Sequence, residues 1–179
     1  MSSVPHWVLS ARHSLFIRRN LQLLRHKTDI PLVQLLGELD QVIPYDSVSF
    51  GNLVENDGLK EVAKYTAAIG PAKEIYAPVN SSNYLAGVDK DFVARAHHAG
   101  LQVHSFTFRN EDRYLAWDYG GDIWNEYDLH FQELGVRYAA SGVYPGLHST
   151  LAGLGVDAAF TDFPGTLARY LKHTTSCCR

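Results

Sequence analysis

The chain has 179 residues, of which 46% are hydrophobic and 20% charged, and its formal net charge at pH 7 is −3. This composition is that of a single folded domain and excludes collagen-like and low-complexity chains. Acidic and basic residues are mixed without a basic stripe, so nucleic acid is not an expected partner. No apolar run is long enough to span a membrane, the start lacks a signal-peptide pattern, and the adjacent Cys177 and Cys178 form no structural disulfide, which together favour the cytoplasm.

Helical and extended periodicities alternate along the chain, which is typical of a parallel α/β fold. In its first half the pattern predicts, in order, a helix over 15–25, a strand over 32–36, an irregular segment over 37–57 and a helix over 59–69. Gly70 followed by Pro71 is interpreted as the end of that helix. The second half predicts a short strand over 74–77, a helix over 90–99, a strand over 101–108, a helix over 122–134, a strand over 158–163 and a last helix to about 171.

Three stretches together resemble glycerophosphodiester phosphodiesterases. They are 59–71 (LKEVAKYTAAIGP), 94–111 (ARAHHAGLQVHSFTFRNE) and 155–165 (GVDAAFTDFPG), and the segment 28–36 (TDIPLVQLL) fits the strand that precedes them in the family. The resemblance extends from about residue 20 to 172. It implies an α/β fold, namely a partial TIM-type (β/α) barrel that corresponds to the C-terminal half of a phospholipase-C-like phosphodiesterase barrel.

This resemblance implies hydrolysis of glycerophosphodiesters to glycerol 3-phosphate and an alcohol, within lipid and glycerol metabolism, with Mg²⁺ or Ca²⁺ in the complete enzyme. The family's His-Arg-Gly motif and its acidic metal ligands lie in the N-terminal half of the barrel, and neither motif is found in this sequence. We therefore assign no catalytic residue and no metal ligand, and we expect no cofactor and no activity for this chain alone. The alternative is a catalytically inactive half-barrel that acts as a binding or assembly module.

The same comparison of motifs suggests how the chain is divided. Residues 1–15 are interpreted as a divergent start, 16–172 as the C-terminal part of the phosphodiesterase domain, 137–152 as an insertion within it, and 173–179 as a tail. Because half of a barrel leaves two strand edges without neighbours, we expect the chain to self-associate through these open edges.

The candidate substrate-binding residues are Arg109, Thr107, Phe106 and Asp162, which lie near the ends of two predicted strands. In parallel barrels the ligand meets residues at the C-terminal ends of strands, and a guanidinium suits a phosphodiester because its planar donors reach two oxygens. Two alternatives remain open. Arg109 could pair with a local carboxylate such as Glu111 or Asp112, and Asp162 could cap the last helix.

Other polar and aromatic residues are interpreted structurally. His104 in the middle of a strand is expected to be a hydrogen-bonded structural histidine. Asp122, Glu126 and His130 recur every fourth residue, and we interpret them as a solvated helix face rather than a metal site. Trp117 and Trp124 are expected in the core.

Overall fold

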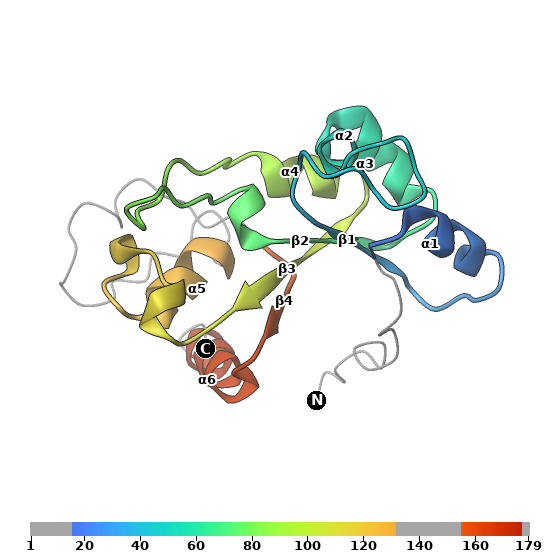
Figure 1. Ribbon diagram of the computed structural model, residues 1–179. Helices are drawn as coiled ribbons and strands as arrows, with labels where there is room; N and C mark the ends of the chain where they lie inside the picture. The colour runs from blue at the N-terminus through green and yellow to red at the C-terminus, as the bar shows by residue number, and fades with distance from the viewer. Residues whose placement is uncertain (1–15, 132–154, 177–179) are drawn as a thin grey trace. The chain divides into compact units, whose positions relative to one another are not determined.

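A computed structural model describes residues 16–131 and 155–176 (Figure 1). The predicted start over 1–15, the insertion over 137–152 and the end of the tail lie outside the described residues. The chain forms two compact units. Of the described residues, the first comprises 16–72 and 95–104, and the second comprises 73–94, 105–131 and 155–176.

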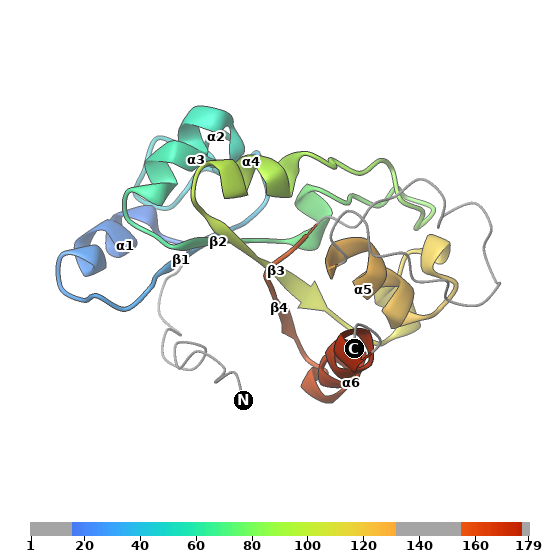
Figure 2. The ribbon, with the colours of Figure 1, turned by 180° about the vertical axis from the view of Figure 1, so that it is seen from behind.

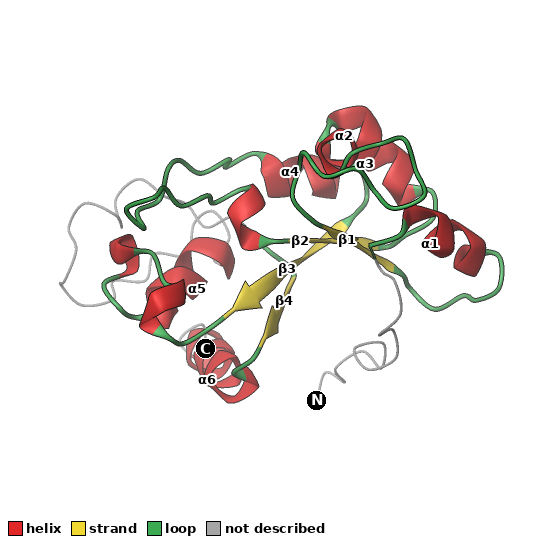
Figure 3. Cartoon of the chain, viewed as in Figure 1, coloured by secondary structure: helices red, strands yellow, loops and turns green. Residues whose placement is uncertain are grey.

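Four strands form one sheet whose spatial order follows the chain. They are β1 (Val33–Leu36), β2 (Ala68–Pro71), β3 (Gln102–Phe108) and β4 (Ala158–Thr161). β1 pairs with β2, and β2 with the start of β3, in parallel. Helices lie between successive strands along the chain (Figure 3), as expected for consecutive βα repeats. The predicted α/β fold is confirmed, and this arrangement is consistent with part of a TIM-type barrel.

The first unit buries the apolar faces of short helices. Its helices are α1 (Arg18–Arg25), α2 (Phe50–Val54) and α3 (Asn56–Ala63), and α2 and α3 lie side by side in Figure 1. α2 forms within a segment that we predicted to be irregular. Ser49 begins it with a capping box, in which the Ser49 hydroxyl accepts from the Asn52 amide and the Asn52 side chain accepts from the Ser49 amide. Phe50 then enters the core, fully buried.

The boundary between α3 and β2 corrects the prediction of a helix over 59–69. The helix ends at Ala63, and Ala68–Pro71 is a strand buried along its whole length. Gly70 is needed for close packing, because a Cβ on it would lie 2.4 Å from Leu35 Cδ2 and 3.2 Å from the His104 carbonyl oxygen. Gly-Pro was therefore wrongly interpreted as a helix stop.

The next segment also differs from its prediction. The expected strand over 74–77 is the 3₁₀ helix η2 (Lys73–Ile75). The chain then follows a long loop over residues 76–91 to α4 (Phe92–His98), which confirms the helix predicted over 90–99.

In the second unit, β3 leads into two 3₁₀ turns, η3 (Asp112–Tyr114) and η4 (Trp117–Tyr119), and then into α5 (Ile123–Phe131). α6 (Pro164–Ser176) is several residues longer than predicted. Figure 2 shows α5 beside α6, and the Tyr127 and Tyr170 rings meet there at 5.1 Å. Within the described residues, no helix has both the length and the apolar character needed to cross a membrane.

Candidate functional site

Arg109 lies directly after β3, and its guanidinium is held by two carboxylates. Arg109 Nη2 lies 2.9 Å from Glu111 Oε1, and Arg109 Nε lies 3.3 Å from Glu111 Oε2 and 3.4 Å from Asp162 Oδ2. The hydrogen bond to Arg109 lowers the pKa of Glu111 below its ordinary value. The alternative that Arg109 pairs with Glu111 is thus confirmed. The same guanidinium also joins the segments that follow β3 and β4.

An aromatic ring completes the surroundings of Arg109. The guanidinium carbon lies 4.3 Å from the centre of the Tyr114 ring, and that of Arg113 lies 4.6 Å from the same centre. Both are cation–π distances. The Arg109 side chain stays about one-third exposed, so a ligand in solution can reach it.

The other predicted binding residues lie on the two strands. Phe106 and Thr107 are half-buried in β3, and the Phe106 ring meets Phe160 of β4 edge-on at 6.5 Å. Thr161 Oγ1 donates to the Phe108 carbonyl at 2.9 Å. The structure therefore brings Arg109 and Asp162 together, whereas it records no polar contact from Thr107 to either of them.

Asp162 was a candidate substrate-binding residue, with capping of the last helix as the alternative. Its carboxylate instead forms the ion pair with Arg109, and no hydrogen bond to it from the amides of α6 is found among the described residues. The hydroxyl of the preceding residue, Thr161, accepts from the Phe163 amide at 3.0 Å and orders the turn into the helix.

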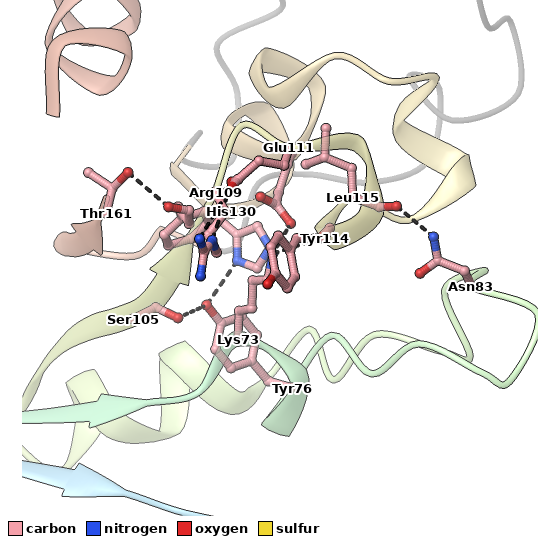
Figure 4. A network of polar contacts seen from close by, with 12 residues as sticks. Lys73, Tyr76, Asn83, Ser105, Arg109, Glu111, Tyr114, Leu115, His130 and Thr161 are labelled. Atoms are coloured by element: carbon pink, nitrogen blue, oxygen red, sulfur yellow. Dashed lines mark hydrogen bonds and ion pairs between the residues drawn. The ribbon is translucent and has the colours of Figure 1, made fainter. Parts of the chain in front are cut away.

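A second polar cluster, which the sequence did not reveal, lies in the same unit (Figure 4). Lys73 follows β2 and is 7% exposed. Its Nζ lies 2.6 Å from Glu126 Oε1 and 3.3 Å from the Tyr114 carbonyl oxygen, and 5.7 Å from the centre of the Phe108 ring. Burial raises the pKa of Glu126 to about 7, although the Lys73 charge acts to lower it. Glu126 Oε2 is buried and has no hydrogen-bond partner in the described part of the chain.

Tyr76 and His130 continue this cluster. The Tyr76 hydroxyl donates to Ser105 Oγ at 2.7 Å and lies 2.8 Å from His130 Nδ1. His130 Nε2 is buried and has no hydrogen-bond partner in the described part of the chain. Burial lowers the pKa of His130 to about 3, which keeps the ring neutral at physiological pH.

The positions of Glu126 and His130 correct the prediction of a solvated helix face, because both side chains are buried. Asp122, one turn earlier, is exposed as expected. The core prediction for Trp117 is also wrong, since 58% of it is exposed. Trp124 does pack inward, against Tyr170.

Two loops of the second unit are joined to each other by hydrogen bonds. Asn83 Nδ2 donates to the Leu115 carbonyl at 2.7 Å, and the Trp117 amide donates to the Asn83 carbonyl at 2.9 Å. The Leu85 amide donates to Asp118 Oδ2 at 2.7 Å. The loop over 76–91 therefore supports the loop that carries η3 and η4.

The described residues do not fit the divalent metal that the resemblance implies. Nowhere in 16–131 or 155–176 do three or more His, Cys, Asp or Glu side chains gather closely enough to hold an ion. His104 is 3% exposed, and its Nε2 lies 3.2 Å from Gln102 Oε1, which agrees with the structural role expected for it.

Comparisons with known proteins give two findings. Residues 13–166 match the model of the glycerophosphoryl diester phosphodiesterase family. The chain is also 28% identical over 155 residues to glycerophosphodiester phosphodiesterase GDPD6 of Arabidopsis thaliana, an alignment that covers 87% of this chain and 36% of that protein. The chain thus spans about a third of the length of this curated relative.

Proposed function

We propose that this chain, which belongs to the glycerophosphoryl diester phosphodiesterase family, forms a substrate-binding part of a phosphodiesterase barrel. The family splits phosphodiester bonds by hydrolysis, and membership confirms the resemblance inferred from the sequence motifs. The proposed substrate is a glycerophosphodiester, cleaved to glycerol 3-phosphate and an alcohol by the complete barrel. The observation that carries the proposal is the Arg109 side chain, which is about one-third exposed and is paired with carboxylates from the segments after β3 and β4.

In this proposal Arg109 binds the phosphate. Without substrate, Glu111 and Asp162 hold the guanidinium in a fixed orientation. A phosphodiester would share its donors with these carboxylates and would be recognised by two oxygens at once. The Thr107 hydroxyl could donate to a further phosphate oxygen, and Phe106 could contact the carbon skeleton of the substrate.

Hydrolysis itself is assigned to residues other than these. A divalent metal would polarise the phosphate, and histidines would transfer protons. Because the sequence lacks the His-Arg-Gly motif and the described residues offer no metal ligand set, we derive no step through a metal on this chain. The chain alone is proposed to bind the product-like phosphate without cleaving the diester.

The test measures turnover and binding on the same purified chain. With glycerophosphocholine and added Mg²⁺ or Ca²⁺, we expect no release of choline above a protein-free blank. Titration with glycerol 3-phosphate should show binding that Arg109→Ala weakens about tenfold, because a hydrogen bond to a charged group contributes about 1.5–3 kcal/mol.

Arg25→Ala removes an exposed arginine of the first unit and serves as the matched control. Metal-dependent turnover would refute the inactivity of the chain. Binding that is absent, or equally strong in the Arg109 variant, would refute the phosphate-binding role.

We also propose that the chain self-associates, which an assembly module would require. β1 and β4 are the outer strands of the sheet in the described part of the chain, and Phe160 on β4 is 42% exposed. Unpaired edges with apolar side chains favour pairing between chains. Light scattering after size-exclusion chromatography should give a mass above 20.0 kDa, and Phe160→Lys should shift it towards the monomer. A wild-type monomer with a sharp melting transition would contradict this.

A further inference from the structure

We propose that Lys73 is a positioning residue for phosphate binding, which holds the Tyr114 backbone and thereby the aromatic ring that supports Arg109. This inference rests on the proposed role of Arg109. It adds a residue that follows β2 in the chain, and within the described structure no hydrogen bond or ion pair joins this residue to the Arg109 guanidinium or to its carboxylates.

The first step concerns why a lysine is buried at this position. Removing an ammonium from water is costly unless it is paired and hydrogen-bonded, and Lys73 uses two of its three donors on Glu126 Oε1 and on the Tyr114 carbonyl. An apolar residue would fill the space above the Phe108 ring without this cost. What the apolar residue could not do is donate to the carbonyl at the end of η3.

The second step leads from that carbonyl to the binding surface. Tyr114 is the last residue of η3, so the backbone that Lys73 contacts is the one that carries the Tyr114 ring. The ring faces the Arg109 guanidinium at 4.3 Å. Figure 4 shows Lys73, Tyr114 and Arg109 in one network of polar contacts, in which Lys73 contacts the Tyr114 backbone and Arg109 its ring.

The third step concerns how much phosphate affinity should depend on Lys73. Asn83 still holds the adjacent Leu115 carbonyl at 2.7 Å, and Glu111 still pairs with Arg109. Loss of Lys73 should therefore loosen the ring without releasing the whole loop. An exposed cation–π contact contributes about 0.5–1 kcal/mol, which corresponds to an affinity change of about two- to fivefold.

The experiment separates positioning from stability by removing both buried charges together. Lys73→Met/Glu126→Leu replaces the ion pair by apolar side chains of similar size, a change that often leaves stability intact. The dissociation constant for glycerol 3-phosphate, the melting temperature and the NMR resonance of the Arg109 Nε–H group are measured for each protein. Lys60→Met, which breaks an exposed lysine–carboxylate pair, is the control.

We expect the double variant to bind about two- to fivefold more weakly at a nearly unchanged melting temperature, with a shifted Arg109 Nε–H resonance, while Lys60→Met matches the wild type. Tyr114→Leu keeps the carbonyl and the ion pair but lacks the ring, and it should weaken binding to the same extent. This second variant tests the inference even if the double variant fails to fold.

Two results would overturn the inference, and they differ in what else they affect. If Arg109→Ala loses affinity but the double variant and Tyr114→Leu do not, Lys73 has no positioning role and the proposed function stands. If Arg109→Ala also binds normally, the proposed function fails and the inference fails with it.

Discussion

Phe108→Ala is expected to lower the free energy of unfolding by about 3–5 kcal/mol, the usual cost of truncating a buried phenylalanine. The ring is fully buried and meets the rings of Tyr127, His130 and Phe131 at 5.6, 5.0 and 5.5 Å between centres. The truncation would leave a cavity among these rings and directly under the Lys73 ammonium. Urea denaturation, with the wild type and the variant fitted to a common slope, measures the difference.

The matched control is Tyr84→Ala, which truncates an aromatic ring of the same unit that is 50% exposed. This variant should lower the free energy of unfolding by less than about 1 kcal/mol, since surface substitutions rarely have a larger effect. Equal losses for the two variants would mean that Phe108 is not the centre of a packed aromatic core.

Glu126→Leu is expected to lower the free energy of unfolding by a similar amount, about 3–5 kcal/mol at pH 8, because Lys73 would remain buried without its counter-charge. Adding Lys73→Met should recover most of this loss, since it removes the unpaired ammonium as well. A double-mutant cycle measures the coupling between the two residues. Losses that simply add would show that the two charges do not stabilise each other in the folded chain.

The pH dependence gives an independent measurement on the same residue. Burial raises the pKa of Glu126 from its ordinary 4.5 to about 7 in the folded chain. A raised pKa means that the folded state keeps a proton that the unfolded state releases. The contribution of Glu126 to the free energy of unfolding is therefore fully present below pH 4.5 and is lost as the pH rises through 7. Relative to Glu126→Gln, the wild type should lose stability over this interval.

His130 contributes with the opposite sign. Its pKa is lowered from 6.5 to about 3, so its contribution is present above pH 6.5 and is lost as the pH falls through 3. The Glu126→Gln comparison cancels this second effect, because both proteins retain His130. A pH profile that is identical in the two proteins would contradict the raised pKa of Glu126.

Several features of this protein could be predicted from its sequence because they depend on short stretches of chain. The alternation of apolar residues predicted β3 and the C-terminal strand β4 nearly in full. Arg109 and Glu111 are two residues apart at the end of a strand, so their pairing requires no other element. The family motifs are likewise local sequence patterns, and the match over residues 13–166 confirmed the family that they indicated.

The prediction from sequence was wrong where one local pattern is compatible with two secondary structures, and only tertiary packing selects between them. Ala68–Pro71 continues the helical composition of the preceding residues, and Gly-Pro commonly ends a helix. In the folded chain the same residues form β2, since the missing Cβ of Gly70 lets Leu35 and the His104 carbonyl approach closely. Without that strand, Lys73 could not be recognised as a residue that follows a strand end.

The buried cluster was decided by tertiary structure alone. The spacing of Glu126 and His130 shows that they share one face of α5, and this much the sequence determined. Spacing does not indicate whether that face meets water or another element. Lys73 lies 53 residues from Glu126, and Tyr76 lies 54 residues from His130. Only when the chain brings these distant segments together does burial become possible, and burial then pairs Lys73 with Glu126 and places His130 beside the Tyr76 hydroxyl.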